Sequence, residues 1–528
     1  MKSPRSSVVP YAPLRHGAVL DAALAAETLT ADIVIVGSGM GGSTLAWALK
    51  DRGLDVLVVE RGRFLPREEE NSVAAEMFLK GRYKTAEPWY DGRTGEAFQP
   101  GVYYWVGGNT KFYGACLPRF RSTDFERTQH YDGVSPAWPF TYDDLEPHYA
   151  AAERLYRVHG TAGEDPTEPP RSTPYPHPAL PHEPVVERFA RSLRSQGLHP
   201  FHMANGMNLD TQAQRVQATA SDGTPSPNDV KSEAENCALR PSLESANVRL
   251  LTEARVTRLL TSQDGTSVVA AEAELRGTTV RIEAKQFVVA GGAVNSAALL
   301  LRSANEQHPR GLGNSSDLLG RNYMVHNSTF FIGINPLRLN RTGWQKTLGL
   351  NDWYTAGPDN EFPLGNLQML GKLQAAHVKG ARAWAPMWAL KAVTDRSIDI
   401  YLTTEDLPDP NNRVRVDGDR IIIDWTPNNT APHRELVRRV TKAVRKAGYP
   451  IVLTERMGIA TNSHMCGTAV AGHDPTTSVL NPQCRSHDVN NLWIVDGSFF
   501  PSSAALNPAL TIAANALRVA PGIADACH

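Results

Sequence analysis

The sequence predicts an α/β protein with two domains: a Rossmann-like nucleotide-binding domain, discontinuous in the chain, and a substrate domain built on a mixed or antiparallel sheet. Three observations predict it. A strand–glycine turn–helix–strand unit stands near the N-terminus, buried-strand patterns return in the middle and near the end, and a region of short strands and turns lies between them. At 528 residues the chain has room for two to four domains of ordinary size. We expect a first domain of residues 1–160, 225–328 and 456–528, and a second of residues 161–224 and 329–455.

Composition excludes several functional classes. Lys and Arg (54) balance Asp and Glu (55), so the chain lacks the basic footprint of a nucleic-acid-binding protein. No apolar run reaches the ~18 residues of a membrane span, and Asp21 and Glu27 interrupt the apolar run 18–29, where a signal peptide would need an unbroken one. Five scattered cysteines do not form a disulfide framework. We therefore expect a soluble, cytoplasmic protein with no nucleic-acid partner and no membrane span.

The first predicted unit is a βαβ motif. Residues 32–37 (DIVIVG) are apolar and β-branched and stop at glycine, as a buried parallel strand does. A helix pattern covers residues 40–52, and residues 54–60 (LDVLVVE) are predicted to form a second buried strand. The crossover between two such parallel strands is expected to be right-handed.

The turn of this unit matches the dinucleotide fingerprint G-x-G-x-x-G. Gly37 allows the tight turn, Gly39 lets the backbone approach a pyrophosphate, and Gly42 allows close packing of helix on strand. Glu60 ends the second strand, where its carboxylate can accept hydrogen bonds from a ribose diol. The pattern does not distinguish NAD from FAD, and a glycine turn without any ligand is the alternative.

The remaining elements follow in order. A proline-rich stretch, residues 166–184, is predicted to be extended. A hairpin is predicted around Asp417-Gly418, because alternating residues flank a preferred turn dipeptide. The other predicted strands are 248–260, 279–290 and 492–497, and the other predicted helices are 142–156, 294–303, 433–447 and 508–519.

A second glycine-rich segment occupies residues 101–121. Gly107, Gly108 and Gly114 surround the polar pair Asn109-Thr110. Such a loop can lay backbone N–H groups against a flat, polar ring system. Taken alone, it is equally consistent with an ordinary surface turn.

His464 and Asn507 are candidates for catalysis. A neutral imidazole can take the proton of an alcohol while the carbon gives up a hydride, and a neighbouring amide can orient the same oxygen. Each residue also has an ordinary interpretation, because His464 is one of 16 histidines and Asn507 precedes a predicted helix as an N-cap would. Sequence spacing does not show whether the two meet.

A zinc site is a rival hypothesis for the same segment. The intervals between its potential ligands match no familiar zinc module, so we expect no metal. The common signatures of serine hydrolases, zinc proteases and P-loop NTPases are also absent from the sequence. The potential ligands are His464, Cys466, His473, Cys484 and His487.

Together these segments resemble the GMC (glucose–methanol–choline) family of FAD-dependent oxidoreductases over most of the chain. The resemblance starts at IVGSGMGGSTLAWALKDRGLDVLVVERG, continues through VGGNTKFYGA, AWPFTYDDLEPHYAAAE, NVRLLTEARVTRLL, FVVAGGAVNSAALLLRS and GLGNSSDLLGRNYMVH, and ends with HMCGTAVAGHDPTTSVLNPQCRSHDVNNLWIVDGSFFPSSAALNPALTIAANALR. It is weakest over residues 331–405, as expected if they form the substrate side.

The resemblance implies a role for each matching position. His464 corresponds to the catalytic base and Asn507 to a second catalytic position, which is His or Asn in different members. Val256 would contact the adenine through its backbone. Asp496 and Gly497 would approach the pyrophosphate and ribityl chain. The implied FAD-binding residues are Gly37, Gly39, Gly42, Glu60, Arg61, Gly107, Gly108, Asn109, Thr110, Gly114, Val256, Asp496, Gly497, Pro508 and Ala509.

The implied activity is FAD-dependent oxidation of a CH–OH group on a polyol, sugar or aminosugar, with O2 or another electron acceptor. Some relatives tether FAD through a histidine in the glycine-rich loop; residues 109–113 (NTKFY) contain none, so FAD is expected to be non-covalent. The loop and tail most resemble flavoprotein dehydrogenases of aminoglycoside biosynthesis. A sterol or simple primary alcohol as substrate, a lyase with the same fold, and an NAD-binding protein are the alternatives.

Overall fold

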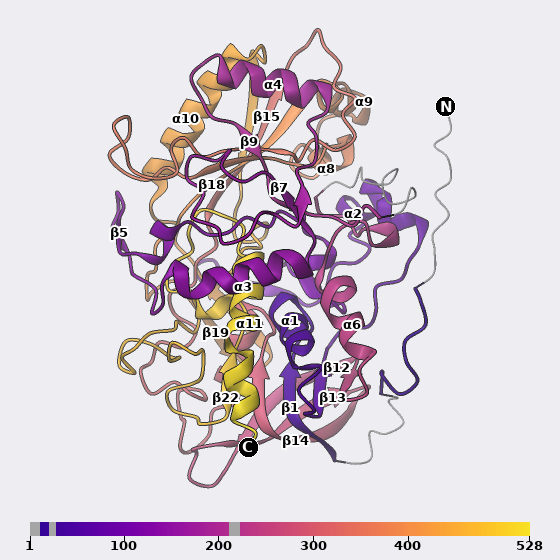
Figure 1. The fold of residues 1–528 in the computed structure, drawn as a ribbon, viewed down its shortest axis with the longest axis vertical. Coiled ribbons are helices and arrows are strands. Elements are labelled where there is room, and N and C mark those ends of the chain that lie inside the picture. Colours follow the sequence, from indigo (N-terminus) through magenta and orange to yellow (C-terminus); the bar gives the residue numbers. More distant parts are fainter. Residues whose placement is uncertain (1–10, 21–27, 211–221) are drawn as a thin grey trace.

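The largest sheet joins segments from the start, middle and end of the chain (Figure 1). The computed structural model describes residues 11–20, 28–210 and 222–528, and this seven-stranded sheet has the order β11-β2-β1-β14-β13-β12, with β22 beside β14. Strands β11, β2, β1, β14 and β22 are parallel, whereas β13 and β12 extend the sheet antiparallel. The bounds are β1 (Leu29–Val36), β2 (Val56–Val59), β11 (Val248–Leu251), β12 (Ala254–Thr261), β13 (Val268–Leu275), β14 (Thr278–Val289) and β22 (Leu492–Ile494).

The predicted βαβ motif is present. Helix α1 (Met40–Leu49) connects β1 to β2, and all four residues of β2 are buried, which explains its uninterrupted apolar sequence. Val36 pairs with Val59 on one side and with Val289 on the other, so the carboxyl ends of three strands meet at one edge. Ligands of open α/β sheets bind at such an edge.

The predicted strand at residues 248–260 is two strands. The chain turns at Glu253, whose φ of 57° lies in the left-handed region, and β11 and β12 then join opposite ends of the sheet. Strand β13 was absent from the prediction because its sequence, VVAAEAEL, contains three alanines, which are poor strand formers. The remaining predicted strands and helices of this region are present within a few residues.

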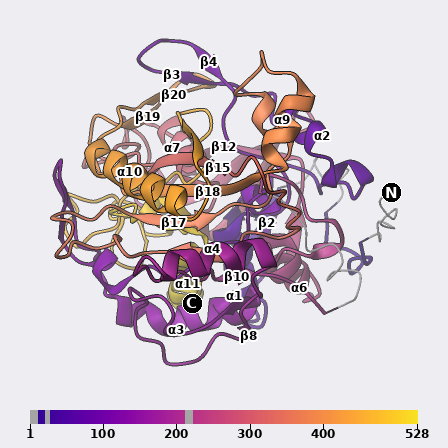
Figure 2. The same ribbon diagram turned by 90° about the horizontal axis from the view of Figure 1, so that it is seen from above.

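A second sheet of six antiparallel strands has the order β21-β15-β18-β17-β16-β9. Helices α4 (Pro184–Arg194) and α10 (Thr430–Lys446) bury their apolar residues against this sheet. Figures 1 and 2 show both helices beside its strands from two directions. Helix α4 was not predicted because it follows the proline-rich stretch, although Pro184 fits the first helical position. The strands are β21 (Ile451–Arg456), β15 (Asn327–Ile334), β18 (Ser397–Thr404), β17 (Asn366–Met369), β16 (Leu348–Leu350) and β9 (Phe201–His202).

The predicted hairpin is formed by β19 (Arg413–Asp417) and β20 (Arg420–Asp424). Strand β20 also pairs in parallel with β3 (Trp89–Asp91), so residues more than 300 positions apart share one small sheet. The other elements are α2 (Ala74–Phe78), β4 (Ala97–Phe98), β5 (Thr128–Gln129), β6 (Val134–Ser135), α3 (Tyr142–Leu155), β7 (Val158–Gly160), β8 (His177–Pro178), β10 (Asn205–Gly206), α6 (Arg240–Leu243), α7 (Ala293–Arg302), α8 (Ala375–Lys379), α9 (Met387–Thr394) and α11 (Ala509–Asp525).

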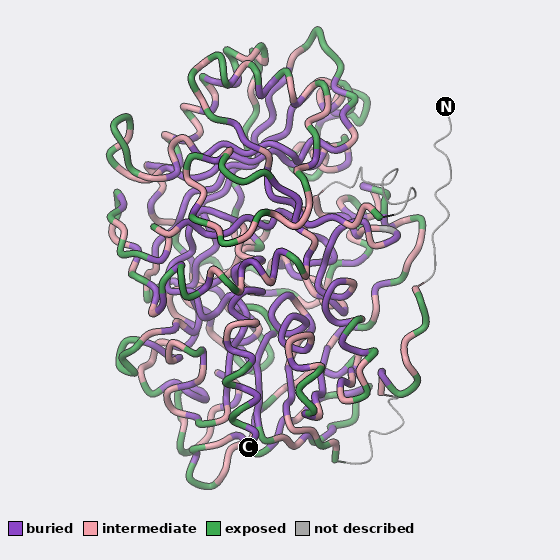
Figure 3. The backbone as a smooth tube through the Cα atoms, viewed as in Figure 1, coloured by how far each residue is buried: buried purple, intermediate pink, exposed green. Residues whose placement is uncertain are grey.

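Buried residues concentrate along the strands of both large sheets and along α1 and α11 (Figure 3). The two largest apolar clusters follow the same division, one around the parallel sheet and one between the six-stranded sheet and its covering helices. Within the described residues, no helix combines the length and apolarity needed to cross a bilayer. Asp21 and Glu27, which bear on the absence of a signal peptide, lie outside the described residues.

Candidate active site

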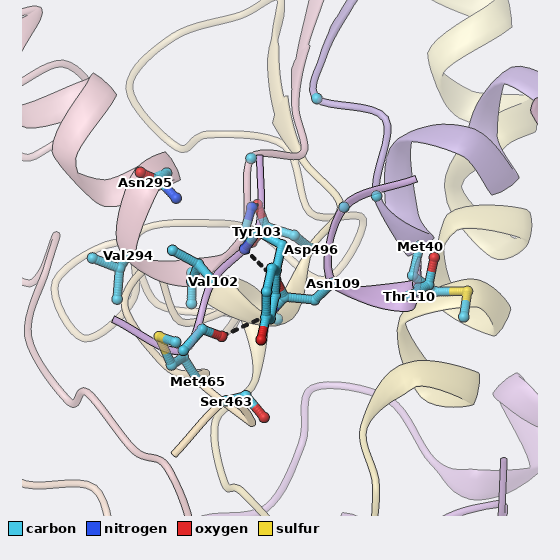
Figure 4. Close-up of a pocket in the computed structure, with 18 of the residues that line it drawn as sticks. Met40, Val102, Tyr103, Asn109, Thr110, Val294, Asn295, Ser463, Met465 and Asp496 are labelled. Atoms are coloured by element: carbon cyan, nitrogen blue, oxygen red, sulfur yellow. Dashed lines mark hydrogen bonds between the residues drawn. The ribbon is translucent and has the colours of Figure 1, made fainter. Parts of the chain in front are cut away.

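A cavity of about 470 Å³ runs from the carboxyl edge of the parallel sheet to the six-stranded sheet. Figure 4 shows part of its lining. Gly37 and Glu60 line it near the parallel strands, and His464 and Asn507 line it near the second sheet. Of the residues implied by the family resemblance, all but Gly42 and Gly107 line this cavity.

The glycines of the fingerprint have distinct roles. A Cβ atom on Gly37, whose φ is +104°, would lie 2.5 Å from the carbonyl oxygen of Ala290, and a Cβ on Gly42 would lie 2.0 Å from the carbonyl oxygen of Gly37. A Cβ on Gly39 would meet nothing within 4 Å. Gly37 and Gly42 are therefore required for packing, whereas Gly39 leaves open space at the N-terminus of α1. This space suits the pyrophosphate of FAD, because the free N–H groups of a helix N-terminus bind anions.

Glu60 and Arg61 lie at the end of β2. The buried Glu60 carboxylate accepts hydrogen bonds from the backbone N–H of Ser38 (3.0 Å), the Ser38 hydroxyl (2.6 Å) and the N–H of Gly62 (2.8 Å). These bonds tie the end of β2 to the glycine turn. Arg61 lies over the ring of Tyr104 at 3.6 Å, and both side chains line the cavity.

The second glycine-rich loop forms a short 3₁₀ turn over Gly108–Lys111. Gly107 (φ +91°) and Gly108 (φ +57°) both need left-handed backbone. The Asn109 side chain accepts the Tyr103 N–H at 2.9 Å, and both residues border the cavity in Figure 4. The loop is thus held rigid beside the cavity.

Asp496 connects two elements at the cavity wall. Its buried carboxylate accepts the N–H groups of Gly292 (2.9 Å) and Ser498 (2.9 Å) and the hydroxyls of Ser296 and Ser498. Burial raises the pKa of Asp496, and these four donors offset part of that effect. The side chain therefore joins the start of α7 to the turn after β22, beside the predicted pyrophosphate position.

The structure brings His464 and Asn507 together. The amide nitrogen Nδ2 of Asn507 lies 3.5 Å from Nε2 of His464, and the Asn507 oxygen Oδ1 accepts a hydrogen bond of 2.7 Å from Gln368. On its other side, Nδ1 of His464 lies 3.2 Å from Nδ1 of His326. Asn507 does not cap α11: Pro508 is the N-cap residue, and no side chain caps this helix.

The surroundings keep His464 uncharged. Burial is the largest cause that lowers the pKa of His464, and together with the neighbouring His326 and Lys346 it brings the pKa to about 3. The imidazole is therefore neutral at ordinary pH and able to accept a proton.

Several cavity residues were not identified from the sequence. Lys346 and Asp222 form an ion pair (3.0 Å) that lines the cavity on the side of the second sheet. His326 and Gln368 lie behind the two candidate catalytic residues. His326 ends the segment GLGNSSDLLGRNYMVH quoted above for the family resemblance, but the roles of all four residues follow only from their contacts. The apolar part of this side consists of Phe330, Leu370, Tyr401 and Met457.

The residues of the rival zinc hypothesis have other contacts. Cys484 is buried against Asn515 of α11, and Nε2 of His487 lies 3.0 Å from the Ser478 hydroxyl. In the described part of the chain, no group of three or more His, Cys, Asp or Glu residues is arranged to hold a metal ion.

Comparisons with known proteins find relatives over most of the chain. Residues 182–328 and 408–516 match the two family models described as GMC oxidoreductase, and residues 35–65 match an NAD(P)-binding Rossmann-like domain. The chain is 32% identical to 6'''-hydroxyparomomycin C oxidase of Streptomyces lividus, covering 94% of this chain and 91% of that one. It is 31% identical to paromamine 6'-oxidase of Streptomyces fradiae (93% and 91%) and 27% identical to the fructose dehydrogenase large subunit of Gluconobacter japonicus (94% and 98%).

Solved structures share the fold. Pyridoxine 4-oxidase from Mesorbium loti superimposes with a TM-score of 0.65 at 21% identity, over 93% of this chain and 98% of that one. A formate oxidase superimposes with a TM-score of 0.66 at 14% identity, over 94% and 98%.

Proposed function

The chain belongs to the GMC oxidoreductase family, and from that premise we propose which residues carry its reaction and which substrates it takes. The reaction is FAD-dependent oxidation of a CH–OH group. When bound, FAD supplies the acceptor for the hydride that leaves the carbon. The residues below would bind the substrate, hold its oxygen and remove its proton.

We assign the base to His464. The neutral imidazole of His464 belongs to the cavity lining, and its Nε2 lies 3.5 Å from Nδ2 of Asn507. This juxtaposition of base and amide carries the proposal. Nε2 would accept the substrate's hydroxyl proton while the N–H of Asn507 donates to the same oxygen. Gln368 holds the Asn507 carbonyl and so keeps the amide N–H directed at the reacting group.

FAD would be held without a covalent bond. The open space at Gly39, the glycine-rich loop and the strand-end residues Glu60 and Asp496 would contact the cofactor. Lys111, a nucleophile in the loop stretch 109–113, is buried and ion-paired with Glu233 (2.8 Å) and Glu235 (2.6 Å), which supports dissociable binding.

An aminosugar or related polyol with a primary hydroxyl is the proposed substrate. Two relatives at more than 30% identity are named for the oxidation of paromamine or a paromomycin derivative. The Asp222–Lys346 pair places a negative and a positive charge on the substrate side of the cavity, which suits a molecule with many polar groups. We also propose that residues 1–160, 225–328 and 456–528 form the FAD-binding domain and that residues 161–224 and 329–455 form the substrate domain. A cytoplasmic location is proposed too, and the five buried, unpaired cysteines support it.

An anaerobic absorbance spectrum tests the proposal. Aminosugars, sugars, a sterol and simple alcohols are added in turn, and we expect an aminosugar that carries a primary hydroxyl to bleach the flavin band. Readmitting air then separates an oxidase, whose flavin band returns, from a dehydrogenase. Bleaching by a sterol or simple alcohol alone would contradict the substrate class. A flavin band that no compound bleaches would favour a lyase.

The His464→Ala variant tests the base. It should keep the flavin band and lose about 10²–10⁴-fold in the rate of flavin reduction. His487→Ala is the matched control, because His487 lies in the same segment but bonds Ser478 outside the cavity. Unchanged reduction in His464→Ala would exclude the role proposed for this histidine.

A further inference from the structure

A second buried histidine stands directly behind the proposed base. His326 immediately precedes β15, is 1% exposed, and has a φ of 66°. The Asp406 carboxylate accepts the backbone N–H groups of Val325 (2.8 Å) and His326 (2.9 Å), which holds this left-handed residue in place. The imidazole of His326 is therefore fixed by its backbone as well as by its ring contacts.

The ring contacts of His326 determine where its proton lies. Nε2 of His326 is 2.9 Å from the carbonyl oxygen of Ser503, and a carbonyl oxygen only accepts hydrogen bonds. Neutral His326 must therefore carry its proton on Nε2, which leaves a lone pair on Nδ1. Nδ1 of His464 lies 3.2 Å from Nδ1 of His326 and must donate its proton to that lone pair. A neutral His464 with a proton on Nδ1 has its own lone pair on Nε2, the atom beside Asn507.

The opposite end of the hydrogen-bond chain leads to the same assignment. The Gln368 amide N–H donates to Oδ1 of Asn507, so the Asn507 NH₂ group must face His464. An NH₂ group requires an acceptor, and the Nε2 lone pair is one. Two separate arguments, from Ser503 and from Gln368, therefore place the lone pair of His464 on the same atom.

We propose that His326 is the positioning residue that fixes the tautomer of His464, so that Nε2 of His464 is free to take the substrate's proton. This inference rests on the role proposed above for His464. When Nε2 takes the proton, the O–H bond breaks, the N–H bond forms, and the Nδ1 proton continues to donate to His326. Neither histidine ring has to turn, so the hydrogen bond from Nδ1 of His464 to His326 is already in place for the charged form of His464.

The competing arrangement is a His326 that carries protons on both nitrogens. Its Nδ1 would then donate to His464 and force the His464 proton onto Nε2, which could not act as a base. The charged groups facing His326 are the carboxylates of Glu405 and Asp406, and the other ring against it is His464 itself. The test must therefore measure the protonated nitrogen directly.

Nitrogen NMR of the ¹⁵N-histidine-labelled holoprotein, without substrate, makes that measurement. The His464 signals are identified by their loss in His464→Ala. We expect a protonated Nδ1 and an unprotonated Nε2 in the wild type, and loss of this preference in His326→Leu. A protonated Nε2 in the wild type, or an unchanged tautomer in His326→Leu, would overturn the proposal. This arm needs no turnover, so it stands even if no tested compound reduces the flavin.

A pair of variants gives the kinetic test. Asn tolerates left-handed backbone and keeps an oxygen acceptor near the position of Nδ1, whereas Leu removes the acceptor and keeps the volume. His326→Leu should lower the rate constant of flavin reduction about 100-fold while the substrate Kd changes little, and His326→Asn should recover most of the loss. Equal loss in both variants would indicate a merely structural role.

His433→Leu is the matched control. His433 is also buried and hydrogen-bonded on both nitrogens, but its partners are Thr329 (2.7 Å) and Thr404 (2.9 Å) rather than a candidate catalytic residue. It should reduce its flavin at nearly the wild-type rate. If His433→Leu slowed flavin reduction as much as His326→Leu, the effect would come from removing any buried histidine, and the proposal would be wrong.

Discussion

At the scale of single residues, one hydrogen bond decides which face of an amide meets the base. Asn507 can present either its oxygen or its NH₂ group to His464, and the bond from Gln368 at 2.7 Å selects the NH₂ group. Gln368 is completely buried and lies on β17, far from either catalytic candidate in the sequence. Gln368 is therefore part of the site, although it takes no direct part in the proposed proton transfer.

Replacing Gln368 tests this selection. In Gln368→Met the side chain keeps a similar volume but does not donate, so the Asn507 amide can rotate and its N–H spends less time on the substrate oxygen. We expect flavin reduction about tenfold slower, with FAD content unchanged, in rapid-mixing absorbance measurements.

The control for Gln368→Met is Gln345→Met. Gln345 is equally buried, but its amide N–H donates to Asp399 (2.7 Å) instead of to Asn507. It should reduce its flavin at nearly the wild-type rate. Equal rates in Gln368→Met and wild type would show that the amide needs no such support.

At the scale of elements, glycines only three positions apart in the strand–turn–helix unit have different roles: Gly42 is needed for packing, and Gly39 leaves space for the cofactor. Alanine at Gly42 would force its Cβ against the carbonyl of Gly37 and push α1 off the sheet, whereas Gly39 has an ordinary φ of −70° and open space before it. Gly41 adds a contact that the fingerprint does not require, since its Cβ would lie 2.1 Å from the carbonyl of Val495. The same helix is thus fixed on two sides by close backbone approach.

Two alanine variants distinguish these roles. Gly42→Ala should be destabilised by about 1–3 kcal/mol or more, seen as a lower unfolding midpoint by circular dichroism. Gly39→Ala should unfold near the wild-type midpoint when both are saturated with FAD, but should bind FAD at least about tenfold more weakly, because its methyl group occupies the pyrophosphate space. A Gly39→Ala protein that retains wild-type FAD affinity would place the cofactor elsewhere.

At the scale of the whole molecule, buried neutral histidines couple stability to pH. His433 joins α10 to β15 and β18 through Thr329 and Thr404, and burial lowers its pKa to about 3. The unfolded chain protonates this histidine near pH 6.5 but the folded protein does not. The stability that it contributes is therefore complete above pH 6.5 and is lost as the pH falls toward 3.

Comparing wild type with His433→Leu isolates this contribution, since all other groups titrate in both. The unfolding free energy of the wild type minus that of His433→Leu should be smaller at pH 5 than at pH 7 by about 2 kcal/mol. The contribution of His433 falls by about 1.4 kcal/mol for each pH unit below 6.5. Urea titrations at the two pH values measure it. A difference independent of pH would mean that His433 has the same pKa in the folded protein as in the unfolded chain.

The sequence by itself determined the elements whose signal is local. The βαβ unit, the fingerprint glycines, the hairpin at Asp417-Gly418 and the long helices each depend on periodicity or turn chemistry within about 20 residues, and the structure contains all of them. The family resemblance also led to His464 and Asn507, which the structure places 3.5 Å apart. Strand β13 and helix α4 were missed because alanine and proline weaken the local pattern.

Only the tertiary structure decided how the base is supported. His326 is 138 positions from His464, and Gln368 is 139 positions from Asn507, on strands of the second sheet or at their ends. Their roles follow from hydrogen bonds between side chains that folding brings together, and no periodicity or spacing along the chain records such a bond. The proton of a histidine depends on the acceptor next to it, so the lone pair that makes His464 a base is a property of the folded molecule.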